Sequence, residues 1–292
     1  MKNYLRILLS QERPMRFVLG RLLRLSGLCR FFKIQQEGYQ LRFFPSNASY
    51  SLWINPGARE RELSLLRAYL REGDRVIDVG ANIGDTALTA SLRVGALGHI
   101  HAFEPHPRIF GYLGGNLELN GVTNVTVHNL AVGACHGRVA FSDRSADDMN
   151  QVLAVGGDME VEMVSLDEFF TEPAPVQLLK VDVEGYEKVV LDGAGRLLRS
   201  VECVYFEVGL EGSIGVVSKR SDLLDLLLCQ GFALFRVAAC GTLCAIGRDY
   251  QSASVENLVA LRDVGDFVRR TDWSVEGGAQ RGGDACMGSQ QS

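Results

Sequence analysis

The sequence predicts an α/β fold built on an open, mostly parallel sheet, and three observations support this prediction. Short apolar runs alternate with helix-like stretches between residues 73 and 230, which is typical of repeated strand–helix units. The first two runs each end in an acid followed by a turn, at Asp78 and Glu104. Two later runs, at 232–237 and 242–246, are separated only by a short turn, so they must pair antiparallel.

The central motif is residues 76–85, VIDVGANIGD, which reads as a buried strand, a tight glycine turn and the start of a helix. Glycine has no Cβ, so a ligand can lie directly against the backbone of such a turn. A dinucleotide site needs glycine at positions 1, 3 and 6 of the turn, but here these are Gly80, Asn82 and Asp85. The pyrophosphate fingerprint therefore fails at two of its three positions.

The acids near this turn favour a cationic ligand. Asp78 and Asp85 are compatible with the sulfonium and ammonium groups of S-adenosylmethionine (SAM), whereas Asp85 makes the helix start less suitable for a phosphate. Glu104 ends the second strand 24 residues after Gly80, close to the spacing at which a strand-end acid binds the two ribose hydroxyls. Pro105 turns the chain directly after this acid.

Short motifs follow one another in a characteristic order along the chain. They are DVGANIG at 78–84, FEP at 103–105, Asn116 and Asn120, SLD at 165–167 and LKVDVEGYE at 179–187. Through these motifs, roughly residues 38–250 resemble the FkbM family of SAM-dependent methyltransferases. The resemblance implies a Rossmann-like class I methyltransferase fold, with a seven-stranded, mostly parallel sheet that ends in an antiparallel hairpin and is preceded by an N-terminal helix and hairpin. It also implies SAM as cofactor and methyl transfer to a hydroxyl oxygen of a saccharide or secondary metabolite.

We expect the cofactor at the carboxyl edge of this sheet, because ligands of open α/β sheets bind outside the carboxyl ends of the strands. Ala131 is included because the resemblance places the end of the third strand, residues 124–132, beside the adenine. The predicted cofactor-binding residues are Asp78, Gly80, Asn82, Gly84, Asp85, Glu104, Pro105, Ala131 and Asp182.

Acids at the ends of the fourth strand (176–183) and the fifth strand (201–207) are the predicted catalytic residues, namely Asp182, Glu184 and Glu207. A hydroxyl is a poor nucleophile, so the reaction needs a base, and we assign that role to Asp182 with Glu184 or Glu207 as alternatives. Asp182 could instead accept a hydrogen bond from the amino group of the methionine moiety. Carboxylates so close together should raise at least one pKa.

Two further roles stay open for this acidic cluster. Lys180 is expected to orient the acids as an ion-pair partner. A divalent metal bound by Asp182, Glu184 and Glu207 could polarise the acceptor hydroxyl, although the preferred interpretation uses no metal.

Two alternative functions compete with methyl transfer. An NAD-linked oxidoreductase would use a related fold, but Asn82, Asp85 and the terminal antiparallel hairpin oppose it. A SAM-binding protein that has lost catalysis is opposed by the intact motifs. The net charge of −5 gives no electrostatic basis for binding nucleic acid, so the expected partner is a small-molecule or saccharide acceptor.

The N-terminal region differs in charge from the rest of the chain. Residues 1–33 carry eight Lys and Arg against Glu12 alone, which motivates the hypothesis of peripheral contact with anionic lipid. In the following segment, Tyr50 and Trp53 are candidates for contact with the acceptor. The predicted parts of the chain are a basic amphipathic helical extension (1–37), a hairpin and helix packed on the core (38–72), the methyltransferase core (73–250), a C-terminal helix (251–270) and a disordered tail (271–292).

The cysteines and the hydropathy pattern suggest a compartment. The seven cysteines are an odd number and are scattered, so we expect reduced thiols rather than a disulfide framework or a zinc site. No apolar run approaches the ~20 residues that cross a bilayer. The N-terminal apolar run at residues 7–9 is too short for the core of a signal peptide. We therefore expect a cytoplasmic protein, and no sequence feature predicts an oligomer interface.

Overall fold

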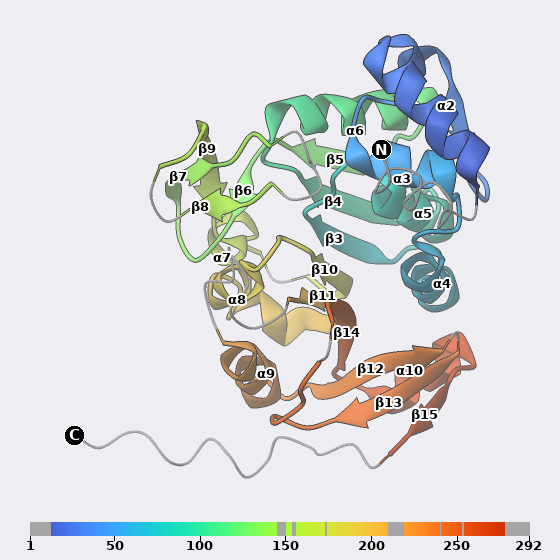
Figure 1. Cartoon of the computed structure of the whole chain (residues 1–292). Helices are drawn as coiled ribbons and strands as arrows, with labels where there is room; N and C mark the ends of the chain where they lie inside the picture. The colour runs from blue at the N-terminus through green and yellow to red at the C-terminus, as the bar shows by residue number, and fades with distance from the viewer. Residues whose placement is uncertain are drawn as a thin grey trace.

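The computed structural model describes residues 13–144, 150–153, 156–172, 174–209, 219–239, 241–252 and 254–277. Within this part of the chain, the strands form a nine-stranded central sheet, a separate four-stranded sheet and a two-stranded hairpin (Figure 1). In spatial order, the strands of the central sheet are β15 (Ser274–Glu276), β13 (Thr242–Ile246), β12 (Ala233–Ala239), β14 (Glu256–Leu261), β11 (Val201–Val208), β10 (Val176–Val181), β3 (Arg75–Val79), β4 (His99–Phe103) and β5 (Val125–His128).

Five neighbouring strands of this sheet, from β11 across to β5, are parallel, as the alternation of strands and helices predicted. The side chains of β11, β10 and β3 are mostly buried on both faces: Val76 of β3 packs in the core on one side, whereas Ile77 and Val79 pack in the core on the other. The helices α5 (Asp85–Val94) and α6 (Pro107–Leu119) cover the first side, and α8 (Glu187–Asp192) and α9 (Arg220–Cys229) cover the second. The carboxyl ends of β3, β4, β10 and β11 consequently share one edge of the sheet.

The predicted C-terminal helix over residues 251–270 needs correction, because residues 256–261 are not helical. They form β14, which lies antiparallel between β11 and β12, and the helix α10 extends only over Val264–Thr271. The reason is burial, because Leu258, Val259 and Ala260 are fully buried and leave no solvent-facing side for an amphipathic surface helix. The predicted antiparallel hairpin is confirmed as β12–β13, but the sheet has nine strands rather than seven.

The predicted disordered tail over 271–292 also needs correction at its start. Residues 274–276 form β15, which pairs in parallel with β13 and extends the sheet by one strand. Residues 278–292 lie outside the described part of the chain.

The N-terminal extension differs from the predicted hairpin. The hairpin itself is short, with β1 (Lys33–Gln35) paired to β2 (Gln40–Arg42), and the following segment is the helix α3 (Asn47–Ile54) instead of a strand. Ser46 starts this helix because its hydroxyl accepts a hydrogen bond from the Ser49 amide at 3.0 Å. The other elements of the extension are α2 (Pro14–Leu25), the 3-10 turn η1 (Leu28–Phe31) and α4 (Glu60–Tyr69).

The two asparagines of the sequence motifs fasten this extension to the core. The buried side chain of Asn116 accepts a hydrogen bond from the Arg42 amide (2.8 Å) and donates one to the Ile83 carbonyl (2.8 Å). Asn120 accepts from the Gln40 amide (2.9 Å) and donates to the Gln40 carbonyl (2.7 Å). These side chains satisfy backbone groups of the edge strand β2 and of the glycine turn, so their role is structural.

The predicted third strand, residues 124–132, is divided between two sheets. β5 ends at His128, and Ala131 and Val132 form β6 of the second sheet. Between them, Asn129 donates hydrogen bonds to the carbonyls of Glu104 and Pro105, each at 2.9 Å. The second sheet has the spatial order β6 (Ala131–Val132), β9 (Met159–Val164), β7 (Gly137–Phe141) and β8 (Val152–Leu153), and the short helix α7 (Leu166–Phe169) follows it.

We predict that β14 is essential for the fold. A chain ending at residue 250, the core boundary suggested by the sequence, lacks the strand that pairs with both β11 and β12. It exposes the edges of both strands, so it should aggregate or unfold without a cooperative transition. A chain ending at Gly277 keeps every described strand and serves as the control, with thermal unfolding followed by circular dichroism. Cooperative unfolding of the shorter chain at the Tm of the control would contradict this prediction.

Candidate active site

A cavity of about 740 Å³ opens at the carboxyl edge of the central sheet. Its walls come from the ends of β3, β4, β10 and β11, from the second sheet, and from α3, α4 and β14. This volume is typical of small-molecule sites. The predicted site residues that line it are Gly80, Asn82, Asp85, Glu104, Pro105, Ala131, Asp182, Glu184 and Glu207.

Gly80 provides the bare backbone at the bottom of the cavity. Its φ of +82° lies in the left-handed region, and an added Cβ would collide with the carbonyl oxygen of Asp182. The amides of Gly80 and Ala81 both donate to the Phe103 carbonyl, at 3.0 and 2.9 Å. The turn is therefore held between the ends of β4 and β10, and any side chain at this position would push β10 away.

Glu104 lies at the end of β4, and its carboxylate is fixed by backbone donors. The amides of Asn82 and His106 each donate to it at 2.9 Å. Burial nevertheless raises the pKa of Glu104 to about 7, because the two amide donors offset only part of the cost of desolvation. An acid in this place, presented to the cavity beside a glycine turn, fits the pair of hydroxyls of a ribose.

The rim of the turn offers acceptors for a cationic group. The side-chain oxygens Asn82 Oδ1 and Asp85 Oδ2 are buried in the cavity wall and have no hydrogen-bond partner among the described residues. Buried acceptors are costly unless a donor satisfies them, and an ammonium group carries three hydrogens for this purpose. Together with Gly80 and Glu104, these atoms fit a nucleoside cofactor that carries an amino group, as SAM does.

Two predicted cofactor residues, Asp78 and Gly84, are not among the residues that line the cavity. Asp78 is fully buried in β3, and its carboxylate lies 3.3 Å from Lys180 Nζ. Gly84 lies at the start of α5 and packs against Leu113. Alternation along β3 explains the first case, because Asp78 faces the same side of the sheet as Val76, toward the buried helix layer.

Lys180 is the centre of the buried charges under the glycine turn. Its Nζ lies 3.3 Å from both Asp78 Oδ1 and Asp182 Oδ2, and it donates to the Gly80 carbonyl at 3.4 Å. Burial acts to lower the pKa of Lys180, but the two carboxylates outweigh burial and raise it above its usual value. These contacts agree with the expectation that Lys180 orients the acids as an ion-pair partner.

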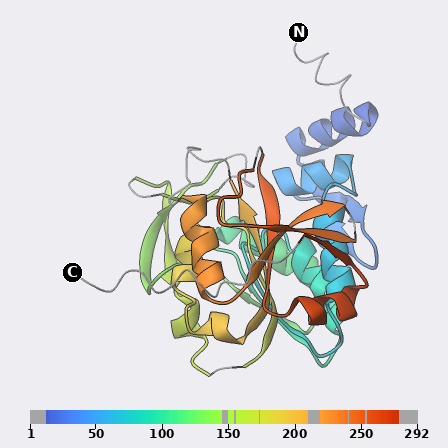
Figure 2. The ribbon, with the colours of Figure 1, turned by 90° about the horizontal axis from the view of Figure 1, so that it is seen from below.

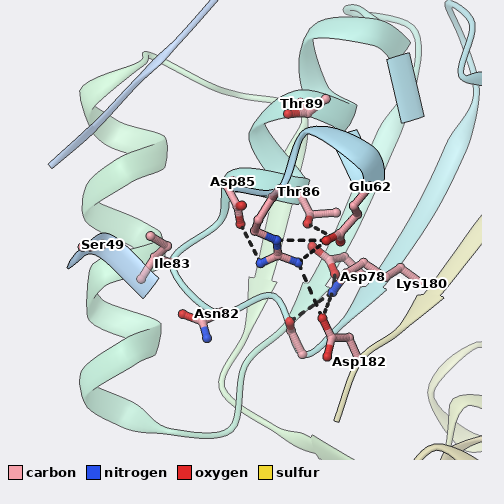
Figure 3. Close-up of polar contacts among 12 residues, drawn as sticks. Ser49, Glu62, Asp78, Asn82, Ile83, Asp85, Thr86, Thr89, Lys180 and Asp182 are labelled. Carbon is pink, nitrogen blue, oxygen red and sulfur yellow. Dashed lines mark hydrogen bonds and ion pairs between the residues drawn. The ribbon is translucent and has the colours of Figure 1, made fainter. Parts of the chain in front are cut away.

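Arg59 is a site residue that sequence reasoning does not identify. It lies directly before α4, and its guanidinium is 2.6 Å from Glu62, 3.3 Å from Asp85 and 3.5 Å from Asp182. Figure 3 labels these three acids, together with the pair of Asp78 and Lys180. No local pattern marks this arginine, because its partners come from α4, from the start of α5 and from the end of β10.

The predicted catalytic acids lie close together but differ in acidity. One oxygen atom from each of Asp182, Glu184 and Glu207 lies within 4.8 Å of the others. Burial raises the pKa of Glu207 to about 9, and the charges of Asp182 and Glu184 add to this effect. Burial also acts to raise the pKa of Asp182, but the positive charges of Lys180 and Arg59 outweigh it and lower this pKa. The raised pKa expected in the cluster is therefore found at Glu207.

The aromatic residues considered for acceptor contact face another element. Tyr50 donates its hydroxyl to the Phe17 carbonyl at 2.8 Å, and Trp53 Nε1 donates to the Arg16 carbonyl at 3.2 Å. Because residues 47–54 form a helix, these rings turn toward α2, and α3 presents Ala48, Ser51 and Leu52 to the cavity instead.

Comparison with known proteins identifies the family of this site. The model of the methyltransferase FkbM domain matches residues 78–232, which is more than half of the chain. The chain belongs to the FkbM methyltransferase family. It is therefore a SAM-dependent methyltransferase with a Rossmann-like class I fold, and the matched region contains every predicted catalytic and cofactor residue. Membership of this family does not support the alternative of an NAD-linked oxidoreductase.

Two curated relatives show the extent of the similarity. The chain is 30% identical over 178 residues to the hexuronic acid methyltransferase AglP of Haloferax volcanii, covering 59% of this chain and 72% of the relative. It is 31% identical over 183 residues to the 31-O-demethyl-FK506 methyltransferase FkbM of Streptomyces tacrolimicus, covering 48% and 70%. Among solved structures, a SAM-dependent O-methyltransferase from Thermotoga maritima aligns with a TM-score of 0.41 at 16% identity, covering 70% of this chain and 65% of that one.

We predict that replacing Lys180 destabilises the protein more than any exposed lysine does. Lys180→Met leaves Asp78 buried without its cation, and breaking a buried ion pair from one side costs about 3–5 kcal/mol. Lys188→Met is the control, because Lys188 forms a helical pair with Asp192 near the surface, and it should cost no more than about 0.5 kcal/mol. Urea unfolding measures both free energies. A loss below about 1 kcal/mol for Lys180→Met would show that the buried pair does not hold the turn.

Proposed function

We propose that this protein is an O-methyltransferase that methylates a hydroxyl group of a saccharide or secondary-metabolite acceptor. The observation that carries the proposal is the acidic cluster in the cavity wall, in which Glu207 is a carboxyl group with a raised pKa. An acceptor oxygen must lose its proton during methyl transfer, and such a carboxylate is suited to take it. The names of the relatives support an oxygen-containing acceptor of this class, since one includes a hexuronic acid, which carries hydroxyl and carboxyl oxygens, and the other a 31-O-demethyl compound.

The proposed cofactor contacts follow from the fit of the cavity. SAM, when bound, supplies an electrophilic methyl group on a positively charged sulfur. Glu104 holds the ribose hydroxyls, while Asn82, Asp85 and Asp182 accept hydrogen bonds from the amino end. The lowered pKa of Asp182 keeps this side chain ionised at neutral pH, which suits contact with a cation.

The base is assigned to Glu207 rather than to Asp182. A carboxylate whose pKa is held down by Lys180 and Arg59 accepts a proton only weakly, so Asp182 is a poor base at neutral pH. Glu207, at the end of β11, has the higher proton affinity and lines the same cavity. In this assignment Glu207 accepts the proton of the acceptor hydroxyl, and Asp182 positions the amino end of the cofactor.

Polar side chains in the remaining wall favour a hydroxylated acceptor. Arg61 of α4 and Asn257 of β14 line the cavity beside the apolar Val237 of β12. Arg61 is exposed, and a guanidinium is well suited to a carboxylate such as that of an acidic sugar. We therefore place the acceptor between the acidic cluster and this part of the wall.

The proposal is tested with methyl-labelled SAM and a panel of hydroxylated acceptors that includes uronic acids and polyols. Methylation of a hydroxyl forms an ether, which survives mild alkali, whereas methylation of a carboxyl group forms an ester, which does not. We expect labelled product that is stable to alkali. Labelled product that is lost in alkali would assign the reaction to a carboxyl oxygen. SAM binding without turnover on any acceptor of the panel would favour the non-catalytic alternative.

We predict a specific pH profile for the assigned base. Only the ionised form of Glu207 accepts a proton, so kcat/KM should rise with pH from about 6 and level off near the pKa of about 9. Glu207→Gln should lower kcat by about 10²–10⁴-fold and flatten this rise, while SAM binding by calorimetry is retained. Glu256→Gln removes another carboxylate of the same wall and should leave the rise unchanged.

Treatment with EDTA separates this assignment from metal catalysis. Carboxylates at this spacing are also compatible with a divalent cation, which would polarise the acceptor hydroxyl directly. With Glu207 as base, turnover is unchanged after EDTA. Turnover that is lost in EDTA and restored by Mg²⁺ would overturn the assignment of Glu207 as base.

A further inference from the structure

The segment from α2 to Phe32 has an exposed apolar surface that methyl transfer does not explain. Seven of the eleven exposed large apolar side chains in the described part of the chain lie within these residues, and Met15 is 85% and Leu25 is 78% exposed. Scattered apolar side chains are normal on a protein surface, but a concentration of this kind marks an interaction site. The seven residues are Met15, Leu19, Leu22, Leu25, Leu28, Phe31 and Phe32.

The helix α2 packs on the protein through Gly20, the buried side chain of Leu23 and two arginines. An added Cβ at Gly20 would lie 2.7 Å from Trp53 Cδ1, so the backbone of α2 directly contacts α3 at this point. Arg16 and Arg24 stack on the rings of Trp53 and Tyr50, 5.6 and 5.1 Å from the ring centroids. These two arginines thus take part in the contact with α3, although Arg16 also stays exposed to solvent.

The apolar side of α2 consequently faces outward. At 100° per residue, Met15, Leu19 and Leu22 fall on one side of the helix, opposite the contacts with α3. Figure 2 shows α2 at a corner of the molecule, beyond α3 and away from the central sheet. An amphipathic helix normally buries this side, so the arrangement leaves it available for a partner.

The charge of the segment indicates the chemistry of that partner. From Arg13 to Gln36 the chain carries six basic residues and no acid. Arg13, Arg21, Arg30 and Lys33 are exposed around the apolar side chains. The rest of the chain is acidic, since the whole protein has a net charge of −5 despite this segment. An anionic surface would therefore attract this segment and repel the body of the protein, which fixes an orientation.

We propose that α2, η1 and Phe32 form a docking surface for an anionic lipid bilayer. Leucine, methionine and phenylalanine side chains enter the interface, and the flanking arginines and lysine contact acidic headgroups. Because α2 has 12 residues and exposes its apolar side chains on one side, the proposal places it in the plane of the surface. Among the described residues, no helix has the length and hydropathy required to cross a membrane. The helix α3 contacts the cavity on one side and α2 on the other, because Ser51 and Leu52 line the cavity and Trp53 donates a hydrogen bond to α2. In this arrangement α2 lies between the bilayer and α3, which forms part of the cavity wall.

The proposal is tested by sedimentation of the full chain with vesicles of phosphatidylcholine, prepared with or without phosphatidylglycerol. We expect binding only to vesicles that contain phosphatidylglycerol, and weaker binding at high salt. The triple variant Met15→Ser, Leu19→Ser, Leu22→Ser should reduce the association constant by about 10-fold or more. The triple variant Arg21→Gln, Arg30→Gln, Lys33→Gln should produce a similar loss.

The control variant carries Leu97→Ser and Arg138→Gln, which replace one exposed apolar and one exposed basic side chain elsewhere on the molecule. It should bind vesicles as the unchanged protein does, and calorimetry with SAM confirms that all variants keep the cofactor site. Equal binding to both kinds of vesicle, or unchanged binding of the two triple variants, would overturn the proposal. A dimer in light scattering that is lost in the Met15→Ser, Leu19→Ser, Leu22→Ser variant, without vesicle binding, would overturn it too and assign the surface to a second copy of the chain.

Discussion

The buried ammonium group of Lys180 is the interaction on which the carboxyl edge of the sheet depends. It joins Asp78 of β3 to Asp182 at the end of β10, and it donates to the carbonyl of Gly80 in the turn between β3 and α5. An unpaired charge in the interior costs several kcal/mol of folding free energy. Replacing Lys180 alone, or Asp78 alone, therefore destabilises the protein through the partner charge that stays buried. One buried cation thus sets the position of the glycine turn and of Asp182, the acid to which we assign contact with the cofactor.

The carboxyl groups in the cavity have different pKa values because their surroundings differ in charge and burial. Asp182 lies between Lys180 and Arg59 and has a lowered pKa, whereas Glu207 is half-buried near other carboxylates and has a pKa of about 9. Glu104 has an intermediate pKa of about 7, because backbone amides only partly offset its burial. A permanently ionised acid suits contact with a cation, and a carboxylate with high proton affinity suits proton transfer. In the proposed assignment, one carboxylate therefore positions the cofactor and another accepts the proton of the acceptor hydroxyl.

The N-terminal extension is connected to this site and to the outer surface of the molecule. Arg59, directly before α4, reaches the acids of the cavity, and Asn116 and Asn120 hold the short hairpin on α6. The helix α3 separates the cavity from α2, whose leucines face outward. Residues that precede the matched family domain thus complete one wall of the site and carry the proposed lipid-binding surface.

The sequence by itself determined the features that depend on neighbouring residues. Apolar runs of strand length, the glycine turn at 78–84 and the acids at strand ends follow short-range rules of burial and backbone conformation, so the parallel half of the sheet and the part of the cavity wall at its carboxyl edge were predictable. The tertiary structure decided what depends on distant partners. Residues 256–261 became a strand because β11 and β12 enclose them, Asp78 became a structural acid because Lys180 faces it, and Arg59 reached the site through acids from three segments. Such choices have no local signal, because the free energy that settles them comes from pairing and desolvation between parts of the chain that only the fold brings together.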